Sequence, residues 1–260
     1  MTTPTLVARG AAGAVVPDRA TTMAVPTALS TTRTALILAA ILIVAGAIRI
    51  FAFHGYWGAD DGEYSLLANA MQRGQFWTFV NEHYVARFDG PAHLPYRFAL
   101  IAPLALLFRL FGVSEPVLVA YPLAISLLGI ALAFACGRHF FGNAGGLLAA
   151  SLYAVIPVDV NNATQFLPDV IATFYASLAV LIVVKADCDA KADTRSLALR
   201  GLGAGVLFGI SWLSKETVTY LVPLCAVMIV SGLRTNVRRT VPLWIGVAVG
   251  SAGILAGEMA

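Results

Sequence analysis

The sequence predicts an all-α, polytopic membrane protein with about seven spans. Hydrophobic residues make up 59% of the 260 residues and charged residues only 12%, whereas soluble domains carry about 25% charged residues. The mean hydropathy is +0.81. Long apolar runs recur along the chain, and about 20 such residues are enough for a helix to cross a bilayer. The composition therefore excludes an ordinary soluble domain.

The N-terminal region divides into a polar segment and a first span. Residues 1–33 are rich in Ala, Thr, Val and Pro, a composition that predicts a disordered segment. The apolar run Thr34–Phe53 follows. It is too long for the core of a secretory signal and has no clear cleavage site before the polar loop. We therefore expect Thr34–Phe53 to be the first span, with the N-terminus in the cytoplasm.

The rest of the chain, from 34 to 260, is expected to form one transmembrane domain. Its further apolar runs are Arg97–Phe111, Val117–Ala135, Ala144–Val158, Asp169–Val184, Leu202–Leu213, Val218–Leu233 and Val241–Ala256. Several are shorter than a full span and need tilt or polar ends to cross. Arg97–Phe111 is short and has Pro103 inside it, so we predict that it does not cross.

The positions of the basic residues support this prediction. If Arg97–Phe111 does not cross, 11 of the 17 Lys and Arg residues lie on the cytoplasmic side and ten of the 14 acids lie outside. If it crosses, eight of these basic residues move outside, against the positive-inside rule. The cytoplasmic basic residues are Arg9, Arg19, Arg33, Arg138, Lys185, Lys191, Arg195, Arg200, Arg234, Arg238 and Arg239. An external loop of about residues 54–116 with two interfacial helices is therefore expected.

The first interfacial helix is predicted over Asp61–Arg73. Apolar residues follow at helical spacing and Gly74 is a typical stop. Asp60 would stand at the N-cap, where a carboxylate accepts hydrogen bonds from the free amides. Three acids, Asp60, Asp61 and Glu63, thus lie close to the bilayer. They are either part of a solvated loop or a working site, and capping alone stays a possible role for Asp60.

The motif Asp60-Asp61-x-x-Tyr64 after a first span resembles the Asp-Glu-x-x-Tyr signature of the GT-C glycosyltransferases. The most similar group is that of the protein O-mannosyltransferases (family 39) and the bacterial lipid A aminoarabinose transferases. Further stretches resemble this group in order over about residues 35–235. They are His93-Leu94-Pro95-Tyr96, Leu110-Phe111-Gly112-Val113-Ser114, Gly137-Arg138-His139-Phe140-Phe141-Gly142, Pro157 with Leu167-Pro168-Asp169, and Gly209-Ile210-Ser211-Trp212-Leu213-Ser214-Lys215-Glu216.

The resemblance implies a membrane glycosyltransferase, mannosyltransferase-like, of the cell envelope. Such enzymes move a sugar from a polyprenyl-phosphate-linked donor to an acceptor hydroxyl on the outer face, with inversion. By the match, Asp60 is the base, and Asp169 is a second catalytic carboxylate that orients the acceptor or assists the base. Asp61, Glu63 and Tyr64 are expected to bind substrate, although Glu63 could instead complete a capping arrangement.

The donor phosphate needs a counterion. Arg49 and Lys215 each lie near the outer end of a span and could hold it, with Glu216 as a further substrate-binding residue. Snorkelling to the headgroups is the alternative for Arg49. A local Lys215–Glu216 pair is the alternative for Lys215. Arg97 resembles an anchor at the membrane surface more than a ligand.

The expected partners follow from the resemblance. They are a lipid-linked sugar donor, a glycan, lipid or protein acceptor, and membrane lipids; no nucleic acid is expected. No metal-ligand motif is present, and a requirement for a divalent metal is left open. The three cysteines, Cys136, Cys188 and Cys225, predict no disulfide framework. The expected location is a bacterial-type inner membrane.

Two other functional classes stay open. One is a transporter or flippase that uses Asp60, Asp169 or Lys215 along a substrate path. The other is a truncated, non-catalytic membrane subunit. Relatives in the resembled group usually have more spans than this chain, so we expect the transmembrane domain to be incomplete at its C-terminus.

Overall fold

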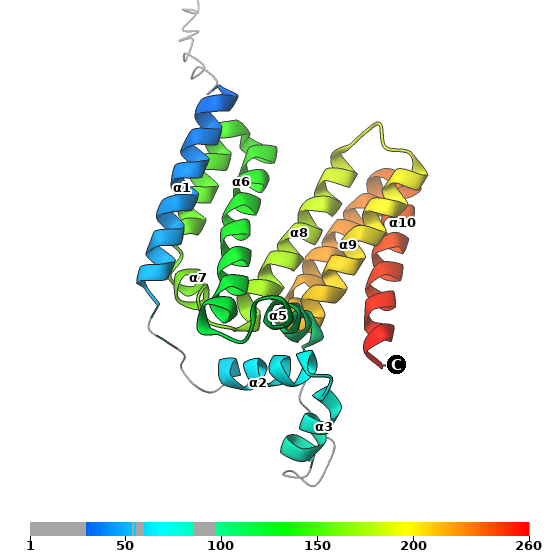
Figure 1. The fold of residues 1–260 in the computed structure, drawn as a ribbon. Helices are drawn as coiled ribbons and strands as arrows, with labels where there is room; N and C mark the ends of the chain where they lie inside the picture. Colours follow the sequence, from blue (N-terminus) through cyan, green and yellow to red (C-terminus); the bar gives the residue numbers. More distant parts are fainter. Residues whose placement is uncertain (1–29, 54, 56–59, 86–96, 260) are drawn as a thin grey trace, which may run out of the picture.

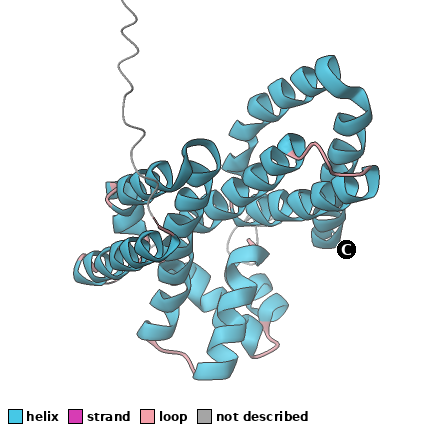
Figure 2. Ribbon diagram, turned by 90° about the horizontal axis from the view of Figure 1, so that it is seen from above, coloured by secondary structure: helices cyan, strands magenta, loops and turns pink. Residues whose placement is uncertain are grey.

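The protein is a bundle of long apolar helices. The computed structural model describes residues 30–53, 55, 60–85 and 97–259, and all regular structure in these ranges is helical (Figures 1 and 2). Within them, five helices are long and apolar enough to cross a membrane. These are α1 (Thr31–Phe51), α6 (Glu115–Ala154), α8 (Pro168–Cys188), α9 (Thr194–Ser214) and the continuous segment of η2 (Glu216–Leu221) with α10 (Val222–Met259). The predicted all-α membrane architecture is confirmed.

Two of these helices are hairpins. The backbone of α6 leaves helical geometry at Gly142, with φ of 71°, and that of α10 does so at Asn236. A Cβ atom on Gly137 would lie 2.5 Å from the carbonyl oxygen of Gly145, so the two arms of α6 meet backbone to backbone. Glycine suits both the positive φ of the bend and this close approach. The two bends divide these five helices into seven apolar segments, which correspond in sequence to the seven spans expected.

The spans form two groups that stand side by side (Figure 1). In the first group, α1 packs on α6 through small and branched residues such as Ala45, Ile130 and Ala150. In the second, α8, α9 and α10 share a core that includes Ala179, Leu197, Ala204 and Leu243. Small side chains let the helix backbones approach closely, which favours helix association within a membrane.

The two groups are joined at one end of the bundle, which we call the outer end. Short helices lie there, opposite the N-terminus of α1 (Figure 1). They are α2 (Asp60–Gln72), α3 (Phe76–Val80), the π-helix η1 (Asn81–Val85), α5 (Phe98–Phe111) and α7 (Pro157–Asn162). A third apolar core beneath them includes Tyr64, Leu104 and Phe166. Helix α5 has 14 residues and is seen nearly end-on beside the upright α8 and α9, so it lies across the bundle, as expected of a segment that does not cross.

Two predicted boundaries need small corrections. Helix α1 begins at Thr31 rather than Thr34, because the Ser30 side chain accepts a hydrogen bond from the Arg33 N–H at 3.3 Å. Residues 1–29, most of the segment predicted to be disordered, lie outside the described residues. Helix α2 begins at Asp60, so Asp60 stands in the first turn rather than at the N-cap.

The end of α2 agrees with the sequence. Gly74 has a φ of 73°. Its N–H donates to the Met71 carbonyl, and the Gln75 N–H donates to the Ala70 carbonyl. This pair of bonds is a Schellman motif, which ends a helix at a residue that favours positive φ.

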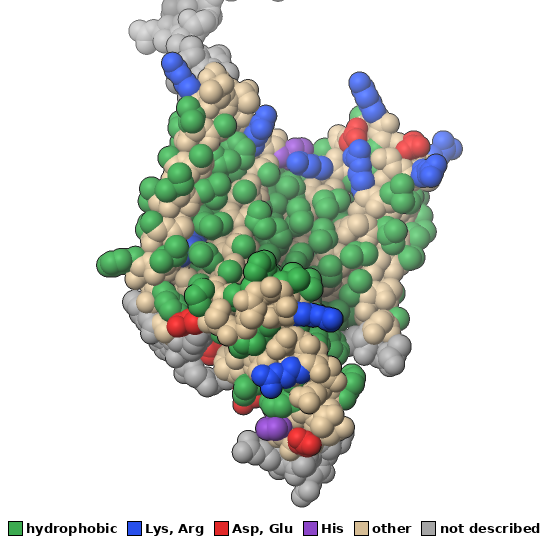
Figure 3. Space-filling model, viewed as in Figure 1, with side chains coloured by type: hydrophobic (Ala, Val, Ile, Leu, Met, Phe, Trp, Pro, Cys, Tyr) green, Lys and Arg blue, Asp and Glu red, His purple; other side chains and the backbone are tan. Residues whose placement is uncertain are grey.

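Basic side chains are more numerous at one end of the bundle, where some acidic side chains also lie (Figure 3). Basic residues gather at the end away from α2, which we call the inner end, around the start of α1, the two bends and the α8–α9 loop. The described basic residues of these segments are Arg33, Arg138, Lys185, Lys191, Arg195, Arg200, Arg234, Arg238 and Arg239. These residues belong to the set that the sequence places on one side of the membrane. That placement is the reason why we expect Arg97–Phe111 not to cross.

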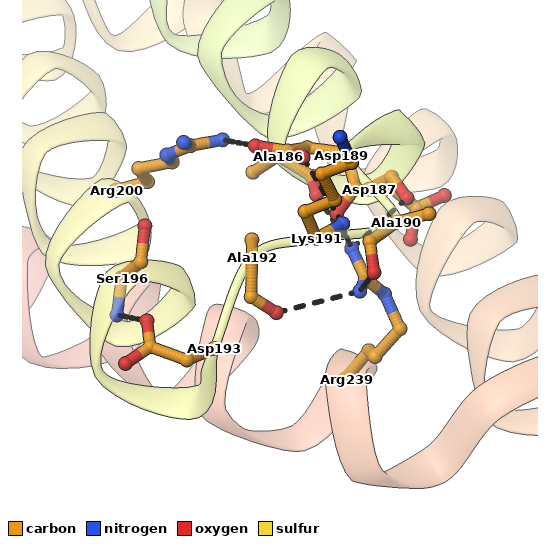
Figure 4. A network of polar contacts seen from close by, with 10 residues as sticks. All are labelled: Ala186, Asp187, Asp189, Ala190, Lys191, Ala192, Asp193, Ser196, Arg200 and Arg239. Carbon is orange, nitrogen blue, oxygen red and sulfur yellow. Dashed lines mark hydrogen bonds and ion pairs between the residues drawn. The ribbon is translucent and has the colours of Figure 1, made fainter.

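A polar network fastens the α8–α9 loop at the inner end (Figure 4). The Arg239 guanidinium, from α10, donates to five backbone carbonyls, two in the last turn of α8 and three in the loop, the shortest bond being 2.6 Å to Asp189. Arg200 forms an ion pair of 2.9 Å with the Asp189 carboxylate. This bond and the Lys191 N–H lower the pKa of Asp189. The network ties the end of α8 to α9 and α10.

Candidate functional site

The start of α2 brings an acidic cluster to the outer end. Asp60 and Glu63 are exposed, whereas Asp61 is only 3% exposed and Tyr64 only 8%. Acids in the first turn of a helix are stabilised by its free amides and dipole. The apolar face of α2 packs on α5 through the outer core, so the helix holds Asp60 at the surface and the Tyr64 ring beneath it.

Arg97, just before α5, lies against Tyr64. Its guanidinium carbon is 5.3 Å from the centroid of the Tyr64 ring, within the range of a cation–π contact. Its backbone has a φ of 39°, in the left-handed region that non-glycine residues seldom adopt. The buried Nε atom has no hydrogen-bond partner among the described residues. The sequence favours a role for Arg97 as an anchor at the membrane surface. In the structure, Arg97 instead lies on the Tyr64 ring.

An ion pair joins the start of α8 to the end of α9. The Lys215 ammonium group donates to an Asp169 carboxylate oxygen at 2.6 Å. Asp169 stands in the first turn of α8, behind Pro168, and Lys215 directly follows α9 with extended backbone. The ion pair bridges 46 positions of sequence. The local Lys215–Glu216 pair that the sequence left open is not the one that forms.

The electrostatics of Tyr64 link these two charged groups. Burial raises the pKa of Tyr64 above its ordinary value of 10.0. The Arg97 charge lowers this pKa, while nearby carboxylates raise it further. These carboxylates are those of Asp60, Glu216 and Asp169. Residues from α2, α8 and the α9–η2 junction thus lie within electrostatic reach of one phenol, and together they form the candidate site.

An apolar groove leads away from this site along α8. Three adjoining cavities of about 180, 260 and 270 Å³ share lining residues and follow one face of the helix. We call them together the α8 groove, defined by Asp169, Thr173, Ser177, Val180 and Val184. Residues of α6 and α7 line the cavity beside Asp169, residues of α9 and η2 line the next one, and residues of α6, η2 and α10 line the third. At 1.5 Å per residue, these positions extend over about 22 Å, most of the roughly 30 Å hydrocarbon core of a bilayer.

Arg49 is not part of the candidate site. Its side chain is fully buried and forms an ion pair of 2.5 Å with Asp159 of α7. It also donates to Ser126 at 2.7 Å and to two backbone carbonyls. The snorkelling alternative is therefore wrong, because the guanidinium points into the bundle. Four of its five N–H donors have partners within the bundle, so its hydrogen bonds go to the protein.

The structure unites some predicted site residues and adds two that sequence reasoning missed. Asp60, Tyr64, Asp169, Lys215 and Glu216 come together, and Asp61 and Glu63 lie beside them in α2. The added residues are Arg97, which lies on the Tyr64 ring, and Asp159, which lines one cavity with Asp169; the partner of each is distant in sequence. The sequence does offer one indication for Arg97, since it is a cation that stands between the acidic motif and an apolar run. The motif His93-Leu94-Pro95-Tyr96 lies outside the described residues.

The described residues contain no group of three or more His, Cys, Asp or Glu side chains placed to hold a metal ion.

Comparison with known families decides the class of the protein. Residues 97–256 match the family model of the dolichyl-phosphate-mannose-protein mannosyltransferases. The chain belongs to this family. No curated protein and no solved structure matches the chain. As a member of the mannosyltransferase family, it is a membrane glycosyltransferase of the GT-C type.

The family match includes some residues of the candidate site and leaves out those of α2. It includes Asp169, Lys215 and Glu216, and also Arg97. The acidic motif of α2, which contains Asp60, precedes the matched residues. Asp60 is linked to Asp169 and Glu216 in the structure because all three carboxylates raise the pKa of Tyr64.

Proposed function

We propose that the protein transfers a sugar from a polyprenyl-phosphate-linked donor to an acceptor hydroxyl at the outer face of the membrane, with inversion. The observation that carries the proposal is the junction of the charged site with the α8 groove at Asp169. An apolar groove suits the lipid tail and the charged end suits the phosphate and sugar. A donor of this kind stays in the bilayer, which is a physical reason for a site at the bundle end.

In the proposed reaction, the acceptor oxygen forms a bond to the anomeric carbon as the bond from that carbon to the phosphate oxygen breaks. The leaving electron pair stays on the lipid phosphate. Asp60 takes the proton of the acceptor hydroxyl as general base. It is exposed and carries no ion pair among the described residues, so the carboxylate is accessible to an acceptor from solution. Asp169 orients the acceptor or assists the base.

Positive charge at the phosphate would stabilise the leaving group. Lys215 is one candidate, because it stands where the α8 groove meets the outer end. Arg97 is the other, because its buried Nε atom lacks a partner among the described residues. A guanidinium group presents several donors in a plane that matches phosphate geometry. Arg97 lies on the Tyr64 ring, and Lys215 pairs with Asp169, one of the three carboxylates that raise the pKa of Tyr64.

Localisation is part of the proposal. The larger number of basic residues at the inner end supports a cytoplasmic inner end and N-terminus by the positive-inside rule. It supports an external acceptor, which is a glycan, lipid or protein hydroxyl. A bacterial-type inner membrane fits a polyprenyl carrier.

A donor-cleavage assay tests the proposal. The full chain in liposomes would receive polyprenyl-phosphate mannose with a radiolabelled sugar, and release of the label would be followed with and without chelator. Asp60→Asn should lower the release by about 10²-fold or more, the contribution expected of a general base. Asp187→Asn is the matched control, because Asp187 is exposed at the inner end. Equal rates in the Asp60→Asn variant and wild type would reject Asp60 as base.

The same assay separates the remaining alternatives. A transporter would move the labelled lipid without cleaving it, and a non-catalytic subunit would do neither. Topology is tested by alkaline phosphatase and fluorescent-protein fusions after Gln165, with controls after Asp89 and Thr194. Phosphatase activity after Gln165 is expected. Fluorescence there would put Asp60 and Asp169 on opposite faces and exclude a shared site.

A further inference from the structure

The Arg49–Asp159 ion pair is the most thoroughly buried charged contact in the described part of the protein. Arg49 is 0% exposed and Asp159 is 7% exposed. The guanidinium contacts two other helices at three points: it donates to Ser126 in the first arm of α6, to the Ala154 carbonyl at the end of the second arm, and to Asp159 in α7.

The carboxylate of Asp159 is equally well bonded. One oxygen accepts from Arg49 and from the Ser126 hydroxyl, each at 2.5 Å. The other oxygen accepts from the Tyr153 hydroxyl at 3.3 Å. The pair therefore fastens α7 to α1 and to both arms of α6. Stability alone is a weak reason for such a pair, since well-packed apolar side chains often replace a buried ion pair without loss.

Asp159 also borders the candidate site. It lines the same cavity as Asp169, which lies ten positions later in the chain. The intervening segment is held in place, because Phe166 is fully buried in the outer core with Tyr64. A displacement of α7 would therefore change the cavity wall that faces Asp169.

We infer that Arg49 and Asp159 form a positioning pair for the transferase site. The pair holds α7 against α1 and α6 and thereby sets the position of the cavity wall beside Asp169. This inference rests on the proposed function. Neither residue contacts the reacting atoms in it; their effect passes through α7 and the segment that leads to Asp169. A small misplacement of a catalytic group is enough to slow a reaction strongly.

The test compares Arg49→Gln, Asp159→Asn and the double variant Arg49→Gln/Asp159→Asn. Each single variant leaves one buried charge unpaired, which should lower the melting temperature. The double variant keeps polar side chains but no charge, so its melting temperature should return close to that of wild type. Thr34→Val is the matched control, because Thr34 is a buried polar residue of the same helix at the inner end.

Two readouts separate positioning from stability. The first is kcat and KM for release of sugar from polyprenyl-phosphate mannose. We expect kcat of the double variant to stay about 10- to 100-fold below wild type, with KM little changed. The second needs no activity: the rate at which a maleimide labels Asn162→Cys in detergent, with Cys136 and Cys225 replaced by Ser. Cys188, exposed at the other end, is the internal standard. Faster labelling is expected in the double variant.

Recovery of wild-type kcat together with the melting temperature would make the pair purely structural and overturn the inference. Unchanged labelling of Asn162→Cys would overturn it as well, because α7 would then stay in place without the pair. A wild-type protein that releases no sugar would instead reject the proposed function. In that case the labelling rate still reports whether the pair holds α7.

Discussion

Lys215, which follows α9, donates a hydrogen bond of 2.6 Å to Asp169, which begins α8. This ion pair joins the end of α9 to the start of α8, and Asp169 also lines the α8 groove. Lys215 is 26% exposed at its side chain and Asp169 is 44% exposed. A pair this open to solvent contributes little to the stability of the fold. Loss of the pair should therefore be seen in the rate of catalysis more than in the free energy of unfolding.

Replacement of Lys215 should separate activity from stability. Lys215→Gln should slow donor cleavage by about 10²-fold, since a cation beside the leaving phosphate is lost. Its free energy of unfolding should change by less than about 1 kcal/mol, because the pair is solvent-screened. Lys185→Gln, at the exposed inner end, is the control. A variant that melts early but keeps its kcat would show that Lys215 is structural.

Tyr64 should make stability depend on alkaline pH. Its pKa is raised in the folded protein, so folding favours the protonated phenol. This contribution is fully present below the ordinary value of 10.0 and is lost as pH rises through the folded pKa. Melting temperatures of wild type and Tyr64→Phe should therefore differ by a constant below pH 10, and wild type should fall faster above it. Parallel curves up to pH 11.5 would contradict the raised pKa.

Gly205 should be required for the contact between α9 and α10. A Cβ atom there would lie 2.1 Å from the Val247 carbonyl oxygen, which is rigid backbone. Gly205→Ala should therefore destabilise the protein by about 1–3 kcal/mol, as overpacking does. Gly203→Ala is the control: the same helix is open there, and the better helix propensity of alanine should make it neutral or stabilising by up to about 1 kcal/mol. Similar unfolding curves in detergent for both variants would refute the close packing.

Arg239 should stabilise the α8–α9 loop. Arg239→Gln removes its charged donors from the loop carbonyls, of which Asp189 is the closest, and should cost about 1–3 kcal/mol. Arg238→Gln is the matched control, because the neighbouring side chain is exposed and lies outside the network of Figure 4. Limited proteolysis of the loop together with thermal unfolding measures the effect. Equal protection in both variants would mean that the carbonyl contacts are dispensable.

Much of the fold could be predicted from local sequence. An apolar run predicts a span, because side chains that face lipid are apolar whichever helices the span packs against. The short segment before Phe111 was assigned to the outer end from its length and from the positions of basic residues. The Gly74 stop of α2 and the bend near Gly142 are also local, since glycine alone adopts positive φ without strain.

The acidic motif, and its resemblance to the GT-C signature, could likewise be recognised in the sequence. The resemblance indicates Asp60 and Asp169, and the residue type and the place of Lys215 at the outer end of a span indicate a counterion. The sequence left their partners open, because proximity between helices is not encoded in residue spacing along the chain.

The tertiary structure alone decided the pairings. Arg49 could have reached the headgroups or a phosphate, yet it is buried against Asp159, 110 positions later. Lys215 could have paired with its neighbour Glu216, yet it contacts Asp169. Arg97 was taken for an anchor, yet it lies on Tyr64. Local periodicity and charge determine which segments are helices and which ends face outward; which charges meet depends on how those helices pack.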